Sequence, residues 1–134
     1  MTESIIEIDG DQAVNLLKQV VEGKEDFIYT SPAIDDGICL YIYEDEPSCG
    51  IGKALALAGV SIDSLKEMDG IGWATSIRAL SERGTEKYGF TLTVDAELVF
   101  SRFQRSQDSG TSWGFCLRQA VKNSALLSPG KYRL

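Results

Sequence analysis

The fold is decided by residues 93–121, which read TVDAELVFSRFQRSQDSGTSWGFCLRQAV. Thr93 and Ser112 are residue types that cap helix N-termini, and each precedes a segment whose apolar residues recur every three to four positions. The first segment extends through Asp108, and only a short Ser/Gly/Thr connection separates it from the second. Because short connections join antiparallel neighbours, we predict a helical hairpin. Its expected inward residues are Ala96, Val99, Phe100 and Phe103, then Trp113, Cys116, Leu117, Ala120 and Val121.

The same periodicity predicts four more helices before this hairpin, each with a plausible cap or stop residue. The first is expected from a cap at Asp9 or Asp11 to Gly23. The second follows the acidic leader Glu44–Ser48 and runs to about Ala58, with Gly59 as its stop residue. The third follows Ser61 and runs through Met68, and the fourth covers residues 73–82, with Trp73, Ile77 and Leu80 inward.

Strand patterns are fewer and shorter. Residues 27–30 and 38–43 are β-branched and aromatic, and the turn residues between them predict that they pair. Both faces of 38–43 are apolar, which favours a central strand with helices on each side. Residues 4–8 form a weaker strand candidate, and glycines favour a loop over 83–92. We therefore predict an α+β fold, a helix-rich single domain over residues 1–127 with a small two- or three-stranded sheet and the C-terminal helical hairpin, followed by a tail over 128–134.

Composition excludes several classes of protein. The 134 residues, 43% of them hydrophobic, suffice for one core without metal or disulfide support. There is no histidine, and Cys39, Cys49 and Cys116 are not closely spaced, so we expect no metal site, no cofactor and reduced thiols. The acidic start and the lack of a run of ~20 apolar residues predict a cytoplasmic protein that neither enters a membrane nor is exported.

Charge is distributed unevenly along the chain. Residues 1–48 hold twelve acids against two bases, a net −10, and the remainder holds eight acids against eleven bases, a net +3, which together give the total of −7. This asymmetry indicates either a surface that meets a charged partner or a solvated acidic face that keeps the protein soluble. The isoelectric point of about 4.5 and the dispersed bases argue against nucleic-acid binding.

The run Cys49-Gly50-Ile51-Gly52-Lys53 is the first candidate site. It lacks the earlier glycine and the following hydroxyl of a phosphate-binding P-loop, so we reject nucleotide binding. Cys49 at a helix start is a weak candidate nucleophile, because the helix dipole favours a thiolate there. The chain offers no histidine as a base, and nearby carboxylates oppose the thiolate. The alternative is that Cys49 is a small buried residue and the glycines allow close packing.

The second candidate site is the trio Gln104, Gln107 and Asp108, which share one helix face. The trio continues a buried stripe, so its polar atoms must be hydrogen-bonded. One interpretation is a structural network that holds residues 109–112, with Asp108 accepting N–H groups of residues 110–112. The other is an amide cluster that binds a ligand, near Cys49.

Two stretches carry a resemblance to known proteins. They are the Cys-x-x-Gly helix start at Cys49 and Gly52, and the run Gln104-x-x-Gln107-Asp108-x-Gly110-x-x-Trp113-Gly114. Over roughly residues 38–121 the chain resembles a set of small uncharacterised actinobacterial and actinophage proteins. The resemblance implies a bacterial or bacteriophage source and no particular activity.

The leading functional hypothesis is a small protein-interaction protein, an adaptor or modulator that binds a protein partner or a second copy of itself. Trp73, Tyr88, Trp113 and Phe115 are candidate contact residues, and Phe115 lies off the inward stripe of its helix, so we expect it to be exposed. The alternative is a small-ligand-binding protein or a cysteine-dependent enzyme with a site near Cys49, Gln104 and Asp108. The absence of a catalytic constellation favours a protein that is not an enzyme.

Overall fold

The computed structural model describes residues 5–29, 41–69 and 76–122, which form a helix-rich α+β domain. Its helices and strands are β1 (Ile6–Ile8), α1 (Gly10–Val21), β2 (Ile42–Tyr43), β3 (Glu46–Pro47), α2 (Gly50–Ala58), α3 (Ile62–Asp69), α4 (Ile77–Arg83), the 3₁₀ turn η1 (Glu86–Tyr88), β4 (Phe90–Leu92), α5 (Val94–Asp108) and α6 (Trp113–Val121). The expected Trp73 and the tail over 128–134 lie outside the described residues.

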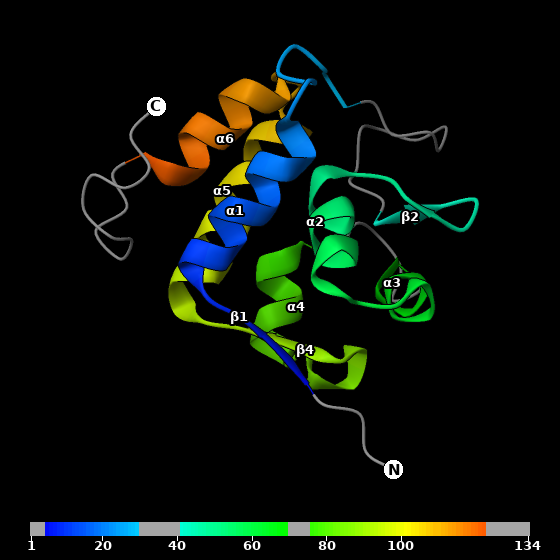
Figure 1. The fold of residues 1–134 in the computed structure, drawn as a ribbon. Coiled ribbons are helices and arrows are strands. Elements are labelled where there is room, and N and C mark those ends of the chain that lie inside the picture. The colour runs from blue at the N-terminus through cyan, green and yellow to red at the C-terminus, as the bar shows by residue number, and fades with distance from the viewer. Residues whose placement is uncertain (1–4, 30–40, 70–75, 123–134) are drawn as a thin grey trace.

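The C-terminal hairpin is confirmed. Thr93 and Ser112 cap α5 and α6 through their side chains, which accept hydrogen bonds from the backbone N–H groups of Ala96 and Phe115. The predicted inward residues are buried, apart from Val121, which is half-buried at the end of α6. Helix α1 lies along both members of the hairpin, so the three helices enclose the main apolar core (Figure 1).

Helix α1 begins where the sequence indicates. Asp9 accepts a hydrogen bond from the backbone N–H of Gln12, whose side chain accepts one from the backbone N–H of Asp9, a capping box that satisfies two free N–H groups. Its apolar stripe faces the core, and Gly23 follows with a φ of 76°, a conformation that glycine adopts at little cost.

The main sheet differs from the prediction. Strands β1 and β4 pair in parallel, with Ile6 opposite Phe90 and Ile8 opposite Leu92. The loop expected over 83–92 therefore contains η1 and β4 instead. Each strand leads directly into a helix, β1 into α1 and β4 into α5, so the pairing fixes where these two helices start relative to each other.

The predicted central strand is also wrong within the described residues. Ile42 and Tyr43 pair with Glu46 and Pro47 in a small antiparallel hairpin, whose turn residues Glu44 and Asp45 have φ of 51° and 65°. Two positive φ values at the turn match the twist of a tight hairpin. Of the segment 27–30, Ile28 forms one isolated bridge to Ser112, and the rest of the expected strand up to residue 29 is absent.

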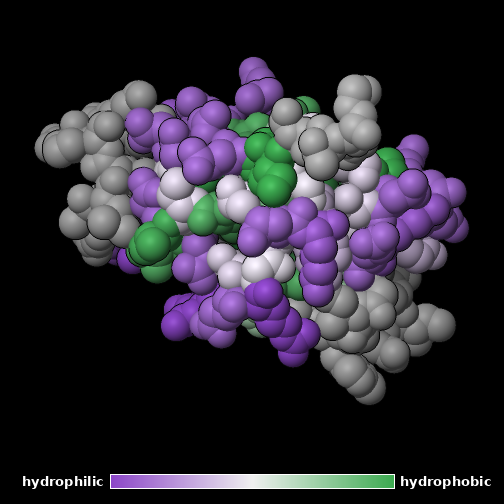
Figure 2. All heavy atoms as spheres, turned by 90° about the horizontal axis from the view of Figure 1, so that it is seen from below, coloured by the Kyte–Doolittle hydropathy of each residue, from purple (hydrophilic) through white to green (hydrophobic). Residues whose placement is uncertain are grey.

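Helices α2, α3 and α4 lie on the side of α1 and α5 that is opposite to α6 (Figure 1). Gly59 ends α2 with a φ of 109°, and Ser61 accepts from the backbone N–H of Ser64, as the sequence predicts. Helix α4 begins at Ile77 after a cap by Ser76, later than expected from the sequence. On the face seen in Figure 2, the apolar side chains of the described residues form separate patches among hydrophilic ones.

Candidate functional site

Gln107 connects three parts of the chain through its side-chain amide. Its Oε1 accepts hydrogen bonds from the backbone N–H of Gly50 at 2.8 Å and from the indole N–H of Trp113 at 3.1 Å. Gly50 is the first residue of α2, so its N–H has no acceptor within the helix. A carbonyl oxygen has two acceptor positions, and both are used here. The Gln107 oxygen is therefore committed to holding α2 and α6 against α5.

Gln104 acts in the same way one turn earlier on α5. Its Oε1 accepts the backbone N–H of Ile77, the first residue of α4, at 2.8 Å, and its Nε2 donates to the Tyr41 hydroxyl at 3.1 Å. Burial raises the pKa of that hydroxyl well above its usual value. Two glutamines spaced by three residues thus supply acceptors to the free N-terminal N–H groups of two different helices. We call this the glutamine network: Gln104 and Gln107 with Gly50, Ile77, Tyr41 and Trp113.

The glycines around Cys49 are explained by close packing. A Cβ placed on Gly52 would lie 2.1 Å from the carbonyl oxygen of Tyr41, and one on Gly50 would lie 2.4 Å from the Phe103 ring. Both distances are far below van der Waals contact, so only glycine fits at either position. The close-packing interpretation is confirmed, and it also explains how Gly50 comes within hydrogen-bonding distance of Gln107.

Cys49 is the N-cap residue of α2 and has no exposed surface. Its Sγ accepts the backbone N–H of Gly52 at 3.5 Å. The sulfur is engaged in a disulfide, so the expectation of reduced thiols is wrong for Cys49. Spacing along the chain does not reveal which thiols approach each other in space, so this bond could not be predicted from the sequence. A buried, oxidised sulfur cannot act as a thiolate, so Cys49 is not a nucleophile while this bond is formed.

Cys116 has a free, buried thiol on α6. Burial raises its pKa, and a contact with the Thr111 hydroxyl only partly opposes this. A thiol that resists ionisation is a poor nucleophile. Cys116 therefore fits the core packing that the sequence predicts for it.

Asp108 differs from its two glutamine neighbours, because the residue as a whole is exposed. The backbone N–H groups of Gly110 and Thr111 donate to the carbonyls of Gln107 and Ser106, not to Asp108, so the predicted turn-capping role is wrong. Its Oδ1 accepts a long hydrogen bond of 3.4 Å from Gln107. Protein atoms crowd the carboxyl group itself, and this desolvation raises its pKa to about 6, with the Gln107 bond opposing the shift.

The candidate contact aromatics divide into buried and exposed groups. Trp113 is 1% exposed, and its ring packs between Phe27 and Phe103, so it belongs to the core. Tyr88 is buried as well. Phe115 is 39% exposed, which confirms the expectation from its place on α6. The helical periodicity that places Trp113 inward also indicates that it is a core residue and not a contact residue.

Phe115 is one of three exposed apolar side chains near the start of α6. Phe27 and Ile28 are 44% and 52% exposed, and their segment is held against α6 because the carbonyl of Phe27 accepts the N–H of Trp113. The Arg118 guanidinium lies over the Phe115 ring, 5.9 Å from its centroid. We call Phe27, Ile28, Phe115 and Arg118 the Phe115 surface. Sequence reasoning missed Phe27 and Ile28 because it assigned them to a paired strand.

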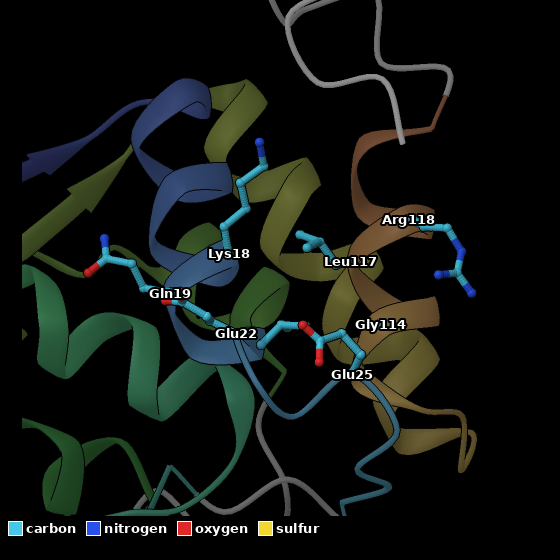
Figure 3. A pocket seen from close by; sticks show the side chains of 8 residues that line it. Lys18, Gln19, Glu22, Glu25, Gly114, Leu117 and Arg118 are labelled. Atoms are coloured by element: carbon cyan, nitrogen blue, oxygen red, sulfur yellow. The ribbon is translucent and has the colours of Figure 1, made fainter.

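A groove of about 640 Å³ borders this surface, between α1 and α6 (Figure 3). Its lining includes Lys18, Gln19 and Glu22 of α1, Glu25 of the following segment, and Gly114, Leu117 and Arg118 of α6. In Figure 3 the Leu117 side chain points toward α1, whereas the Arg118 guanidinium points away from it. The backbone N–H of Gly114 donates to the Glu25 carbonyl at 2.9 Å, and a Cβ on Gly114 would lie 3.0 Å from that oxygen. Glycine at this position thus allows the segment to cross α6 and form one end of the groove.

Among residues 5–29, 41–69 and 76–122, no three Cys, Asp or Glu side chains cluster as ligands for a metal ion. Within the same ranges, none of the helices has the length and apolar character needed to cross a bilayer.

Comparison of the chain with protein-family models, with curated proteins and with solved structures finds no match to any of them.

Proposed function

We propose that this protein is a small interaction protein, an adaptor or modulator that binds a protein partner or a second copy of itself through the Phe115 surface. The supporting observation is the exposed aromatic ring of Phe115, which lies under the Arg118 guanidinium. Phe27 and Ile28 are also exposed, on the segment that is hydrogen-bonded to the start of α6, and a groove lies between α1 and α6. Aromatic residues and arginine are enriched at protein interfaces, and buried aromatics surrounded by a polar rim supply much of the binding energy.

The charges along the groove indicate what such a partner presents. Lys18 and Arg118 contribute positive charge, and Glu22 and Glu25 contribute negative charge. Charges of both signs disfavour a uniformly charged ligand such as nucleic acid, because part of the groove would always repel it. A matching partner segment carries an apolar anchor for Phe115 with charged groups of both signs around it.

The setting of this interaction follows from the resemblance. If the chain is encoded by an actinophage, its partner is a protein of the host cell, and the contact takes place in the cytoplasm. The oxidised Cys49 weighs against this location, since disulfides are rare in the cytosol outside redox-active proteins. The cytoplasmic part of the proposal therefore requires that the fold persists when this bond is reduced.

The proposal is tested with a photo-crosslinking amino acid at Phe115 in the full-length chain. The matched control carries the same amino acid at Val94, which is 70% exposed at the opposite end of the α5–α6 hairpin. After irradiation in host extract, and separately with purified protein alone, we expect a discrete crosslinked species from position 115 and none from position 94. Ile28→Asp in the first variant should remove that species. Identical crosslinking from both positions, or none from position 115, would contradict the proposal.

A further inference from the structure

A second cavity, of about 400 Å³, lies away from the Phe115 surface between α4 and the C-terminal half of α5. Its size falls within the range of about 300–1,000 Å³ that is typical of small-molecule sites. The side chains that matter for its chemistry are Ser76, Arg78, Ser101, Gln104, Arg105 and Asp108.

Hydrogen-bond donors dominate this cavity. The Arg105 guanidinium has no hydrogen-bond or ion-pair partner within residues 5–29, 41–69 and 76–122. Arg78 contacts Glu82 at 3.5 Å, but both side chains are more than 60% exposed, so this pair is weak and easily exchanged. The cavity therefore presents two guanidinium groups, one from each helix, that can turn to a ligand.

The hydroxyl groups add donors. Ser101 Oγ is shielded from solvent and has no hydrogen-bond partner in the described part of the chain. Because this hydroxyl has no hydrogen bond to break, a rotation about the Ser101 χ1 angle that turned it toward the cavity would let a bound oxygen accept its hydrogen. Ser76 Oγ accepts from the N–H of Ala79, which leaves its own hydrogen free to donate.

Acceptors in the cavity are few. The Gln104 amide is already used by Ile77 and Tyr41, so it forms a fixed wall. Asp108 stands at the exposed rim, where Gln107 donates to it. An excess of donors, including two planar guanidiniums, matches the oxygen atoms of an oxyanion, which arginine binds with paired hydrogen bonds.

We propose that the cavity between α4 and α5 binds a small ligand through a phosphate or carboxylate group, held by Arg78 and Arg105 with the Ser101 hydroxyl as a further donor. This site is independent of the protein contact proposed for the Phe115 surface. It also gives Gln104 and Asp108 a place beside a ligand, with Gln104 as a wall and Asp108 as the group at the entrance.

The test is an NMR titration of the full-length, isotope-labelled protein at low ionic strength, with inorganic phosphate in one series and acetate in the other. We expect saturable shifts at the Arg105 side-chain N–H and at the amides of Ser76 and Ser101. Arg105→Gln should weaken the binding about tenfold or more, because it removes charge-assisted hydrogen bonds. Stronger saturation by phosphate would identify a phosphorylated ligand, and stronger saturation by acetate a carboxylic acid.

The matched control is Arg102→Gln on the same helix. Arg102 donates to the carbonyl of Lys122 and does not line the cavity, so its replacement removes the same charge from α5 without touching the site. Arg105 is exposed and Arg102 is partly exposed, so we expect both variants to fold, which the same spectra verify. Shifts that grow linearly with both anions, or saturable binding that survives in Arg105→Gln, would overturn the proposal.

Discussion

Replacing Gln107 with leucine tests the glutamine network directly. The substitution keeps the approximate size of the side chain and removes the oxygen that accepts the Gly50 N–H and the Trp113 indole N–H. Both donors are buried, so water cannot replace the lost acceptor. Each unsatisfied buried group costs about 1–3 kcal/mol, and the pair therefore costs about 2–6 kcal/mol. The extra apolar burial of leucine offsets part of this, and we expect a loss of about 3 kcal/mol.

The assay is denaturant unfolding in non-reducing buffer, followed by far-ultraviolet circular dichroism. This signal reports helix content and does not depend on the surroundings of Trp113, which the substitution changes. The matched control is Gln19→Leu, the same chemical change at an exposed residue of α1 whose amide makes one long bond of 3.4 Å to Asn15. Surface changes of this kind stay within about 0.5 kcal/mol. If Gln107→Leu were no more destabilising than the control, the network would not hold these helices together.

Three further predictions concern packing, pH and thiols. Gly52→Ala should destabilise the protein far more than Gly23→Ala in the same unfolding assay. A Cβ at Gly52 would clash with the Tyr41 carbonyl, whereas a Cβ at Gly23 would clash with nothing and add only the strain of a positive φ. Because the pKa of Asp108 is raised, its ionisation opposes folding, so wild type should lose stability relative to Asp108→Asn as the pH rises from about 4 to about 6; a difference that does not change with pH would contradict the shifted pKa. Since Cys49 is oxidised, titration of the denatured protein with a thiol reagent should give fewer than three free thiols per chain before reduction and three after reduction.

The helices could be predicted because their signals are local. Thr93 and Ser112 each lie directly before a segment with helical apolar periodicity. Because the connection between the two helices has only four residues, the second helix packs antiparallel to the first. The capping box at Asp9 is equally local. Where a helix is specified by its own residues, sequence reasoning finds it.

The sheet could not be predicted because its pairing is not local. Strands β1 and β4 are three residues each and lie at opposite ends of the chain's first two thirds, so neither carries a pattern that identifies the other. Acidic residues suit a helix N-terminus, so the sequence predicts that Glu44 and Asp45 lead into a helix. In the structure they form a tight turn, and Asp45 pairs with Lys66 of α3 at 2.5 Å.

The candidate site shows the same division. The position of Gln104 and Gln107 on a buried stripe is enough to predict that both side chains are hydrogen-bonded. Their partners, the first N–H groups of α4 and α2, could not be predicted, because they depend on how α2, α4 and α5 pack together. The cavity beside Ser101 and Arg105 was missed for the same reason, because its residues come from separate helices.

Hydrogen exchange at the amides of Gly50 and Ile77 tests the central claim most directly. If the two glutamine side chains hold these N–H groups, both should exchange only through global unfolding, as slowly as the most protected amides inside α5. Exchange at the rate of free helix N-termini at either position would contradict the glutamine network.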